Sequence, residues 1–222
     1  MTGRDWVAWA KPGVFLLCLL PLALTLAQGL GGGLALGANP VETLLHRSGL
    51  WTLRMLLLTL ALTPLSRALG RPWPIRLRRM LGLFAFFYGM LHLLVYLWLD
   101  RALDWPVIVE DLTERPYIIV GMVALVLMSV LALTSTRGWQ RRLRRNWKRL
   151  HRVVYLIAVL GVLHFLWLVK ADLREPLIYA VILGVLLALR LPWGRWRRAW
   201  TQSVQSVQSA PAVARRSASS SR

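Results

Sequence analysis

Residues 80–99 read MLGLFAFFYGMLHLLVYLWL, a run of apolar side chains with no formal charge and a single histidine, His92. A helix that crosses a membrane needs roughly 20 mostly apolar residues. The lipid interior offers the backbone no hydrogen-bond partners, so such a segment must satisfy its own polar groups by forming a helix. This stretch therefore predicts a transmembrane helix that carries an ionisable residue.

Apolar runs of similar length follow one another along the chain, separated by short polar gaps. They lie at about 12–30, 48–66, 80–99, 117–135, 152–169 and 177–192. We therefore expect an all-α, polytopic membrane protein with about six transmembrane helices. The expected organisation is a cytoplasmic N-terminus at 1–11, a transmembrane domain at 12–192, and a basic, disordered cytoplasmic tail at 193–222, which is rich in Ser, Gln, Ala and Arg.

The basic residues are distributed unevenly between the two sets of gaps. Of the 28 Lys and Arg residues, 22 lie in the N-terminal segment, the gaps after the second and fourth runs, and the tail, whereas the opposite gaps hold only five basic residues and eight of the nine acids. Cytoplasmic loops are enriched in Lys and Arg. The pattern predicts that both termini are cytoplasmic, and it explains the net charge of +19 without a nucleic-acid partner.

Two histidines lie at matching depths within predicted helices that run in the same direction. His92 is ~18 Å from the cytoplasmic start of its run, and His164 is ~19.5 Å from the start of its own. Ionisable residues at membrane depth are costly and mark functional sites. Two imidazoles at one depth on two helices suit a heme with two histidine ligands, between the third and fifth transmembrane helices. The alternative is two unrelated histidines, each bonded to backbone or hydroxyl groups.

Three other ionisable residues lie near the membrane boundaries or within a run. His151 is at the cytoplasmic start of the fifth run, where a solvated role is an alternative to a cofactor role. His46 precedes the second run at the opposite face, as a helix-start residue. Arg54 is ~10 Å inside the second run, near the depth of the histidine pair. It either pairs with a heme propionate, or it has a structural role, by extending toward the membrane surface or by pairing with another helix.

Several short strings together resemble a known family, the MsrQ or YedZ heme-binding membrane subunits of bacterial periplasmic methionine-sulfoxide reductase systems. That family belongs to the ferric-reductase-like transmembrane proteins. The resemblance covers about Asn39 to Pro176. The strings are Asn39-Pro40-Val41-Glu42, His46, Gly49, Thr63-Pro64-Leu65, Arg79, Leu81-Gly82-Leu83, Tyr88, His92, Tyr96, Glu110-Asp111, Arg115-Pro116-Tyr117-Ile118, Leu133-Thr134-Ser135, Trp147, Leu150-His151, Tyr155, His164, Lys170 and Pro176.

The resemblance implies heme b, with His92, His151 and His164 at the family's heme-associated positions, and His92 and His164 as iron ligands. It also implies FMN and electron delivery to a periplasmic molybdopterin-containing catalytic subunit, MsrP. Relatives with two hemes carry a second histidine on the third helix, where this chain has Arg78. One firmly bound heme is therefore expected, and His151 is left to a second heme, a flavin or a quinone.

The resulting hypothesis is an electron-transfer subunit of a bacterial inner membrane, reduced by membrane quinol or by a separate flavin reductase. No glycine-rich nucleotide-binding motif occurs in the sequence, which argues against direct NADPH oxidation by this chain. Two alternatives stay open: an autonomous transmembrane ferric reductase-type cytochrome b, and a cofactor-free transporter or scaffold.

Overall fold

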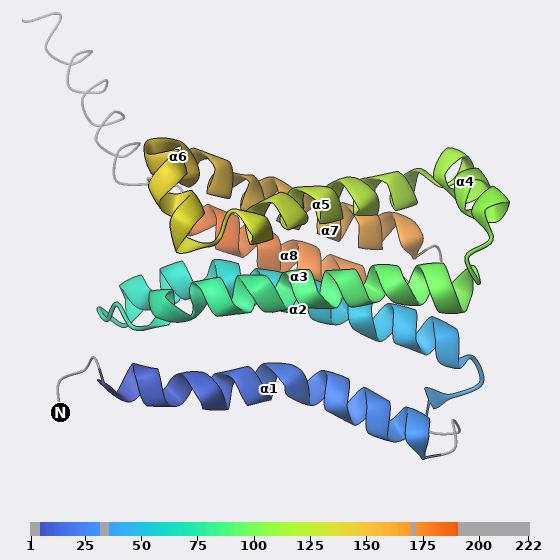
Figure 1. The fold of residues 1–222 in the computed structure, drawn as a ribbon, viewed down its shortest axis with the longest axis horizontal. Helices are drawn as coiled ribbons and strands as arrows, with labels where there is room; N and C mark the ends of the chain where they lie inside the picture. The colour runs from blue at the N-terminus through green and yellow to red at the C-terminus, as the bar shows by residue number, and fades with distance from the viewer. Residues whose placement is uncertain (1–4, 32–35, 170–171, 191–222) are drawn as a thin grey trace, which may run out of the picture. The chain divides into compact units, whose positions relative to one another are not determined.

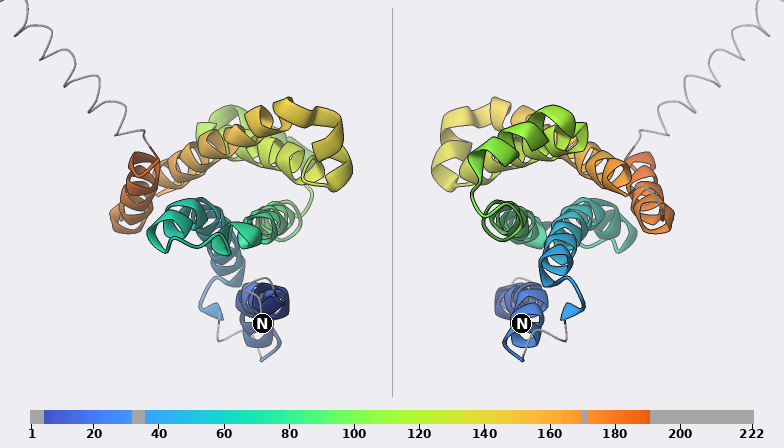
Figure 2. Two further views of the ribbon diagram at one scale, coloured as in Figure 1. Left: turned by 90° about the vertical axis from the view of Figure 1, so that its left-hand side faces the viewer. Right: turned by 90° about the vertical axis from the view of Figure 1, so that its right-hand side faces the viewer.

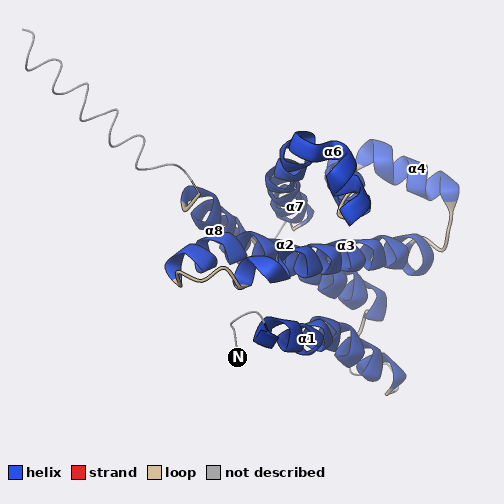
Figure 3. Cartoon of the chain, turned by 60° about the vertical axis from the view of Figure 1, so that its left-hand side comes forward, coloured by secondary structure: helices blue, strands red, loops and turns tan. Residues whose placement is uncertain are grey.

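The computed structural model describes residues 5–31, 36–169 and 172–190, and every regular element in these ranges is a helix (Figure 3). The chain divides into two compact units, 1–186 and 187–222, and the fold below is that of the first. The predicted tail at 193–222 lies outside the described residues. The elements are α1 (Asp5–Leu30), α2 (Pro40–Ala68), η2 (Pro74–Leu77), α3 (Arg78–Leu94), η3 (Val95–Asp100), α4 (Trp105–Glu114), α5 (Pro116–Leu133), α6 (Arg137–Leu150), η4 (His151–Val153), α7 (Val154–Leu168) and α8 (Arg174–Ala188).

The helices confirm a polytopic, all-α membrane protein. Five helical segments of the described chain are long and apolar enough to cross a membrane: Trp9–Leu30, Pro40–Ala68, Pro74–Asp100, Pro116–Leu133 and Arg137–Leu168. They correspond to the first five predicted runs. The sixth run falls on α8, whose 15 residues are fewer than a full span needs, and the end of that run lies outside the described residues.

The second helix begins eight residues before the predicted apolar run. Asn39 caps it, because its side-chain oxygen accepts a hydrogen bond from the backbone N–H of Glu42 at 3.3 Å. Pro40 occupies the first turn, where its missing N–H costs nothing. Because α2 begins at Pro40, His46 lies within this helix rather than ahead of it. Hydropathy alone does not predict this polar first part of the helix.

The transmembrane helices pack as two helical hairpins. The helix α2 packs along α3, and α5 packs along α7, while α3–α5 and α2–α7 contacts join the two hairpins. Figures 1 and 2 agree that α2 and α3 lie between α1 and the α5–α7 pair. One helix of each hairpin carries a member of the predicted histidine pair.

The first helix packs at the side of this arrangement, against α3. The Tyr88 hydroxyl donates a 2.7 Å hydrogen bond to the backbone carbonyl of Cys18, and both residues are buried. Most large apolar side chains of α1 are exposed, as expected for a helix that faces lipid. A buried tyrosine needs such a partner, so this bond defines where α1 docks.

Two of the gaps between runs form short helices that the hydropathy pattern does not predict. The acidic outer gap contains α4, and the basic gap after the fourth run contains α6, which has a break at Arg144 (φ 44°). Figure 1 shows α4 and α6 at opposite ends of α5. The basic and acidic gaps are therefore separated by the length of a transmembrane helix.

Candidate functional site

A cavity of about 850 Å³ opens between the two hairpins. Its walls are mostly apolar and come from α2, α3, α5 and α7. The polar side chains of the lining include both histidines of the predicted pair, which are partly buried, and two tyrosines, Tyr96 and Tyr117. An apolar cavity of this size with a few convergent polar groups is typical of a cofactor site.

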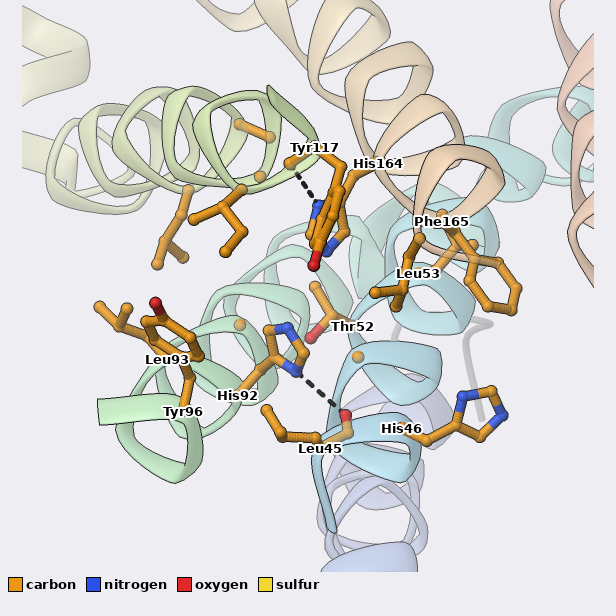
Figure 4. A pocket seen from close by; sticks show the side chains of 18 of the residues that line it. Leu45, His46, Thr52, Leu53, His92, Leu93, Tyr96, Tyr117, His164 and Phe165 are labelled. Atoms are coloured by element: carbon orange, nitrogen blue, oxygen red, sulfur yellow. Dashed lines mark hydrogen bonds between the residues drawn. The ribbon is translucent and has the colours of Figure 1, made fainter. Parts of the chain in front are cut away.

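His92 from α3 and His164 from α7 face each other across this cavity (Figure 4). Their ring centroids are 6.2 Å apart and the ring planes are nearly perpendicular, at 84°. The sequence predicts these two residues at one depth, and the structure brings their side chains together. Among the described residues, no group of three or more His, Cys, Asp or Glu side chains surrounds a common point.

Each histidine of this pair is oriented by a backbone carbonyl of the neighbouring helix. The Nδ1 atom of His92 lies 3.0 Å from the carbonyl oxygen of Leu45, and that of His164 lies 2.7 Å from the carbonyl oxygen of Tyr117. A carbonyl oxygen only accepts, so Nδ1 carries the proton in both rings. This tautomer leaves the Nε2 lone pair free, on the ring edge that faces the other histidine (Figure 4).

A glycine lies against each imidazole ring and allows it to approach the helix backbone. A Cβ on Gly49 would stand 3.2 Å from Cε1 of His92, and a Cβ on Gly121 would stand 2.8 Å from Nδ1 of His164. Any side chain at Gly121 would displace the ring, because carbon atoms do not approach so closely. The two glycines are thus needed for the positions of the histidines rather than for a turn.

The two halves of the site repeat one another along the chain, a feature that the sequence analysis missed. Each histidine lies 47 residues after the residue whose carbonyl it binds. Each of these carbonyl residues comes four positions before the glycine under the ring. The string Gly89-Met90-Leu91-His92 also returns as Gly161-Val162-Leu163-His164. An internal comparison of the sequence would have found this repeat.

Arg54 makes interhelical contacts rather than lining the cavity. Its Nε donates to the Tyr179 hydroxyl of α8 at 2.8 Å, and one terminal nitrogen lies 3.9 Å from a Glu175 oxygen. His46 lies 3.4 Å from the other oxygen of that carboxylate and borders the cavity at its α2 side. These contacts favour the interhelical role among the two that the sequence allows for Arg54. Its pairing with a propionate stays a prediction.

His151 is in η4, away from the histidine pair and outside the cavity lining. Its ring stacks on Trp147 with centroids 4.1 Å apart, and its Nε2 lies 3.2 Å from the Thr134 hydroxyl. The Trp147 indole N–H donates to the Thr134 carbonyl at 2.9 Å. The group holds the end of α5 against the start of α7.

Comparison with known families assigns the cavity region to one class of membrane protein. Residues 48–162, which contain most of both hairpins, match the family described as the ferric reductase like transmembrane component. The chain is thus a ferric-reductase-like transmembrane protein, and the match includes His92 but ends two residues before His164.

Individual relatives narrow this class. The protein-methionine-sulfoxide reductase heme-binding subunit MsrQ of Xanthomonas campestris pv. campestris (strain 8004) is 50% identical over 206 residues, covering 91% of this chain and 93% of that protein. The MsrQ of Rhodospirillum rubrum is 55% identical over 204 residues, covering 89% and 97%. The chain belongs to the MsrQ family.

Proposed function

We propose that the chain is a membrane electron-transfer subunit that binds heme b between α3 and α7, where His92 and His164 would hold the iron. It would pass electrons to the catalytic subunit of a periplasmic methionine-sulfoxide reductase. The observation that carries this proposal is the pair of facing imidazoles whose Nδ1 atoms are both bound to backbone carbonyls.

The spacing of the two rings fits a metal ion held between them. A bond of about 2 Å from metal to imidazole nitrogen, plus roughly 1 Å from that nitrogen to the ring centre, would put the centroids of two imidazoles on either side of a metal ion about 6 Å apart. The observed separation is 6.2 Å. Two protein ligands suffice when a macrocycle supplies the other coordination positions, and a cavity of about 850 Å³ is within the range of cofactor sites.

The side chains around the histidines have separate tasks in this proposal. The carbonyls of Leu45 and Tyr117 fix the tautomer and raise the basicity of each ligand nitrogen. The Ser48 hydroxyl, 3.3 Å from Nδ1 of His92, adds a second polar contact on that side only. The apolar walls keep water away and so influence the reduction potential. When bound, the heme supplies a one-electron carrier.

The direction of transfer and the partners rest on the family resemblance and on the charge pattern. The relatives' name speaks of a protein-methionine-sulfoxide reductase, which supports a catalytic partner of that kind, and we propose the molybdopterin-containing MsrP. Electrons would enter from membrane quinol or from a flavin reductase, with FMN as a second cofactor. The chain would lie in the bacterial inner membrane with both termini cytoplasmic, and His151 would serve the cytoplasmic half of the relay.

The proposal is tested by heme analysis of the full chain, purified in detergent after heme-replete expression. We expect a b-type pyridine hemochrome and a six-coordinate, low-spin spectrum in the wild type. His92→Ala and His164→Ala should lose this spectrum, whereas His151→Ala should keep it. A second heme in the wild type would add a site without changing the assignment of this one.

A matched experiment separates loss of a ligand from loss of the fold. His164→Gly leaves a space that free imidazole can enter, so added imidazole should restore the low-spin spectrum of a correctly folded chain. A colourless wild-type protein would overturn the proposal. A low-spin spectrum that persists in His92→Ala would show that this residue is not a ligand.

A further inference from the structure

The outer end of the cavity is bordered by a cluster of charges around Asp111 of α4. This carboxylate is buried, with its side chain 6% exposed. One oxygen lies 2.6 Å from Nε of Arg101 and accepts a 2.9 Å hydrogen bond from the Tyr96 hydroxyl, and the other lies 3.1 Å from Nε of Arg115. A buried carboxylate requires such compensation.

Asp111 contacts each arginine at its Nε atom, and this leaves the terminal nitrogens of each guanidinium available. Within the described chain, every ion pair of Arg101 and Arg115 runs through Nε, including the 3.3 Å pair of Arg101 with Asp100. One terminal nitrogen of Arg115 also donates to the Tyr117 hydroxyl at 3.4 Å. The remaining terminal N–H groups form the planar fork that binds a carboxylate with two hydrogen bonds.

Both arginines border the cavity, and among the described residues that line it they are the only two arginines. They belong to one side of its mouth, at the end of η3 and the start of α5. The acids Glu42 and Asp172 border the cavity from the side of α2 and α8, and Asp100 borders it beside Arg101. The guanidinium groups that line the cavity are therefore all on one side of its mouth, and there they offer N–H donors to an anion.

The positions of the arginines also suit a ligand held by the histidine pair. Arg115 comes two residues before Tyr117, whose carbonyl orients His164. Arg101 comes nine residues after His92, just past the π-helical segment η3, and its long side chain can extend back toward the level of the histidines. Tyr96 and Tyr117 line the cavity between the histidine pair and the two arginines.

We propose that Arg101 and Arg115, held in place by Asp111, bind the two propionate carboxylates of the heme at the outer mouth of the cavity. This inference rests on the proposed function. It assigns the propionates to Arg101 at the end of η3 and Arg115 at the start of α5 instead of to Arg54, and it orients the heme with its propionates toward the acidic outer gap. The terminal N–H groups of the arginines would replace hydrogen bonds that the propionate oxygens make in water.

The test compares loss of an arginine with loss of the propionate charge. The full chain, produced without heme, is reconstituted with heme or with heme dimethyl ester, in which both carboxylates are neutral. The measured quantity is the rate at which each leaves the protein for an apomyoglobin acceptor. In the wild type, we expect the ester to leave at least about tenfold faster than heme.

The effects of arginine substitution and of esterification on the release rate should not be additive. Arg101→Gln and Arg115→Gln should release heme faster, by a similar factor, and the doubly substituted chain should release heme and its ester at nearly equal rates. Arg174→Gln removes one positive charge from the same side of the membrane without bordering the cavity, so its rates should match the wild type with both ligands.

Two outcomes would overturn the inference. One is a doubly substituted chain that releases heme no faster than the wild type. The other is that the rate increases caused by substitution and by esterification multiply, because the arginines around Asp111 would then have a purely structural role. Failure of the proposed function looks different, because the wild type would then bind neither ligand with a six-coordinate spectrum. A low-spin spectrum of the ester in Arg115→Gln verifies that the variant has folded.

Discussion

Gly121 lies directly against the imidazole ring of His164, so closely that a Cβ at this position would stand 2.8 Å from Nδ1. Ring and glycine can occupy these places only while the glycine has no side chain. Gly121→Ala should therefore push the ring away from the Tyr117 carbonyl and weaken heme binding about tenfold or more, as other losses of ligand support do. Heme occupancy of the purified variant measures this effect.

Alanine substitutions at two further glycines serve as comparisons for the heme occupancy of Gly121→Ala. Gly49→Ala brings a Cβ to 3.2 Å from Cε1 of His92, a contact that a small shift relieves, so its loss should be smaller. Gly184→Ala adds a methyl group on α8 with nothing within 4 Å, so full occupancy should persist. Equal occupancy in all three variants would contradict the close packing of His164.

Arg54 offers a test of the two roles that the sequence leaves open. Because it bonds to Tyr179 and lies near Glu175, Arg54→Gln should loosen α8 and lower the free energy of unfolding by about 1 kcal/mol. Tyr179→Phe should cost a similar amount. Heme content should stay at the wild-type level in both, as measured by absorbance of the purified protein.

A rapid loss of heme from Arg54→Gln, at normal stability, would instead support the propionate role. The double variant provides the control, because two substitutions that remove one shared hydrogen bond should cost less together than their separate costs predict.

The bond between Tyr88 and Cys18 predicts how firmly α1 is attached. Tyr88→Phe removes the hydroxyl that donates to the Cys18 carbonyl and should lower stability in detergent by roughly 0.6 kcal/mol, the average for interhelical hydrogen bonds in membranes. Cys18→Ala keeps the carbonyl, so its effect should come from packing alone and should be unchanged when Tyr88 is already Phe. A strong coupling between the two side chains would contradict this arrangement.

The charge pattern predicts the orientation in the membrane. Reporter fusions after Gly70 and at the C-terminus should be active only with a cytoplasmic reporter, and a fusion within α4 only with a periplasmic one. Replacing the basic residues of α6 by Gln should weaken this preference, because Lys and Arg near the membrane determine topology. Periplasmic activity of the C-terminal fusion would contradict the expected even number of spans.

The fold follows from the sequence wherever hydropathy decides it. The runs around His92 and His164 predict transmembrane helices, and counting residues from the membrane edge places the two side chains at one depth. Which partners these side chains meet depends on how each helix is rotated about its own axis, and hydropathy carries little information about this rotation. The carbonyl partners of the histidines and the contact of Arg54 with α8 therefore emerge only from the packed helices.

The short helices α4 and α6 were missed for a different reason. Their polar residues resemble those of loops, and each helix is too short to form the apolar run of a span. The position of Arg115 beside the cavity depends on how α4 folds back from α3. A sequence alone therefore pointed to the deeper Arg54 as the cation nearest the histidines.

Each hairpin carries one histidine together with the carbonyl and the glycine that position it, so each half of the chain is a complete half-site. A chain severed within the outer gap between Asp100 and Arg115 would lose no part of either half-site. Two such fragments, made separately in one membrane, should associate more tightly with the iron porphyrin than through the α3–α5 and α2–α7 contacts alone. The cofactor would then hold the two fragments of a split protein together as well as carry its electrons.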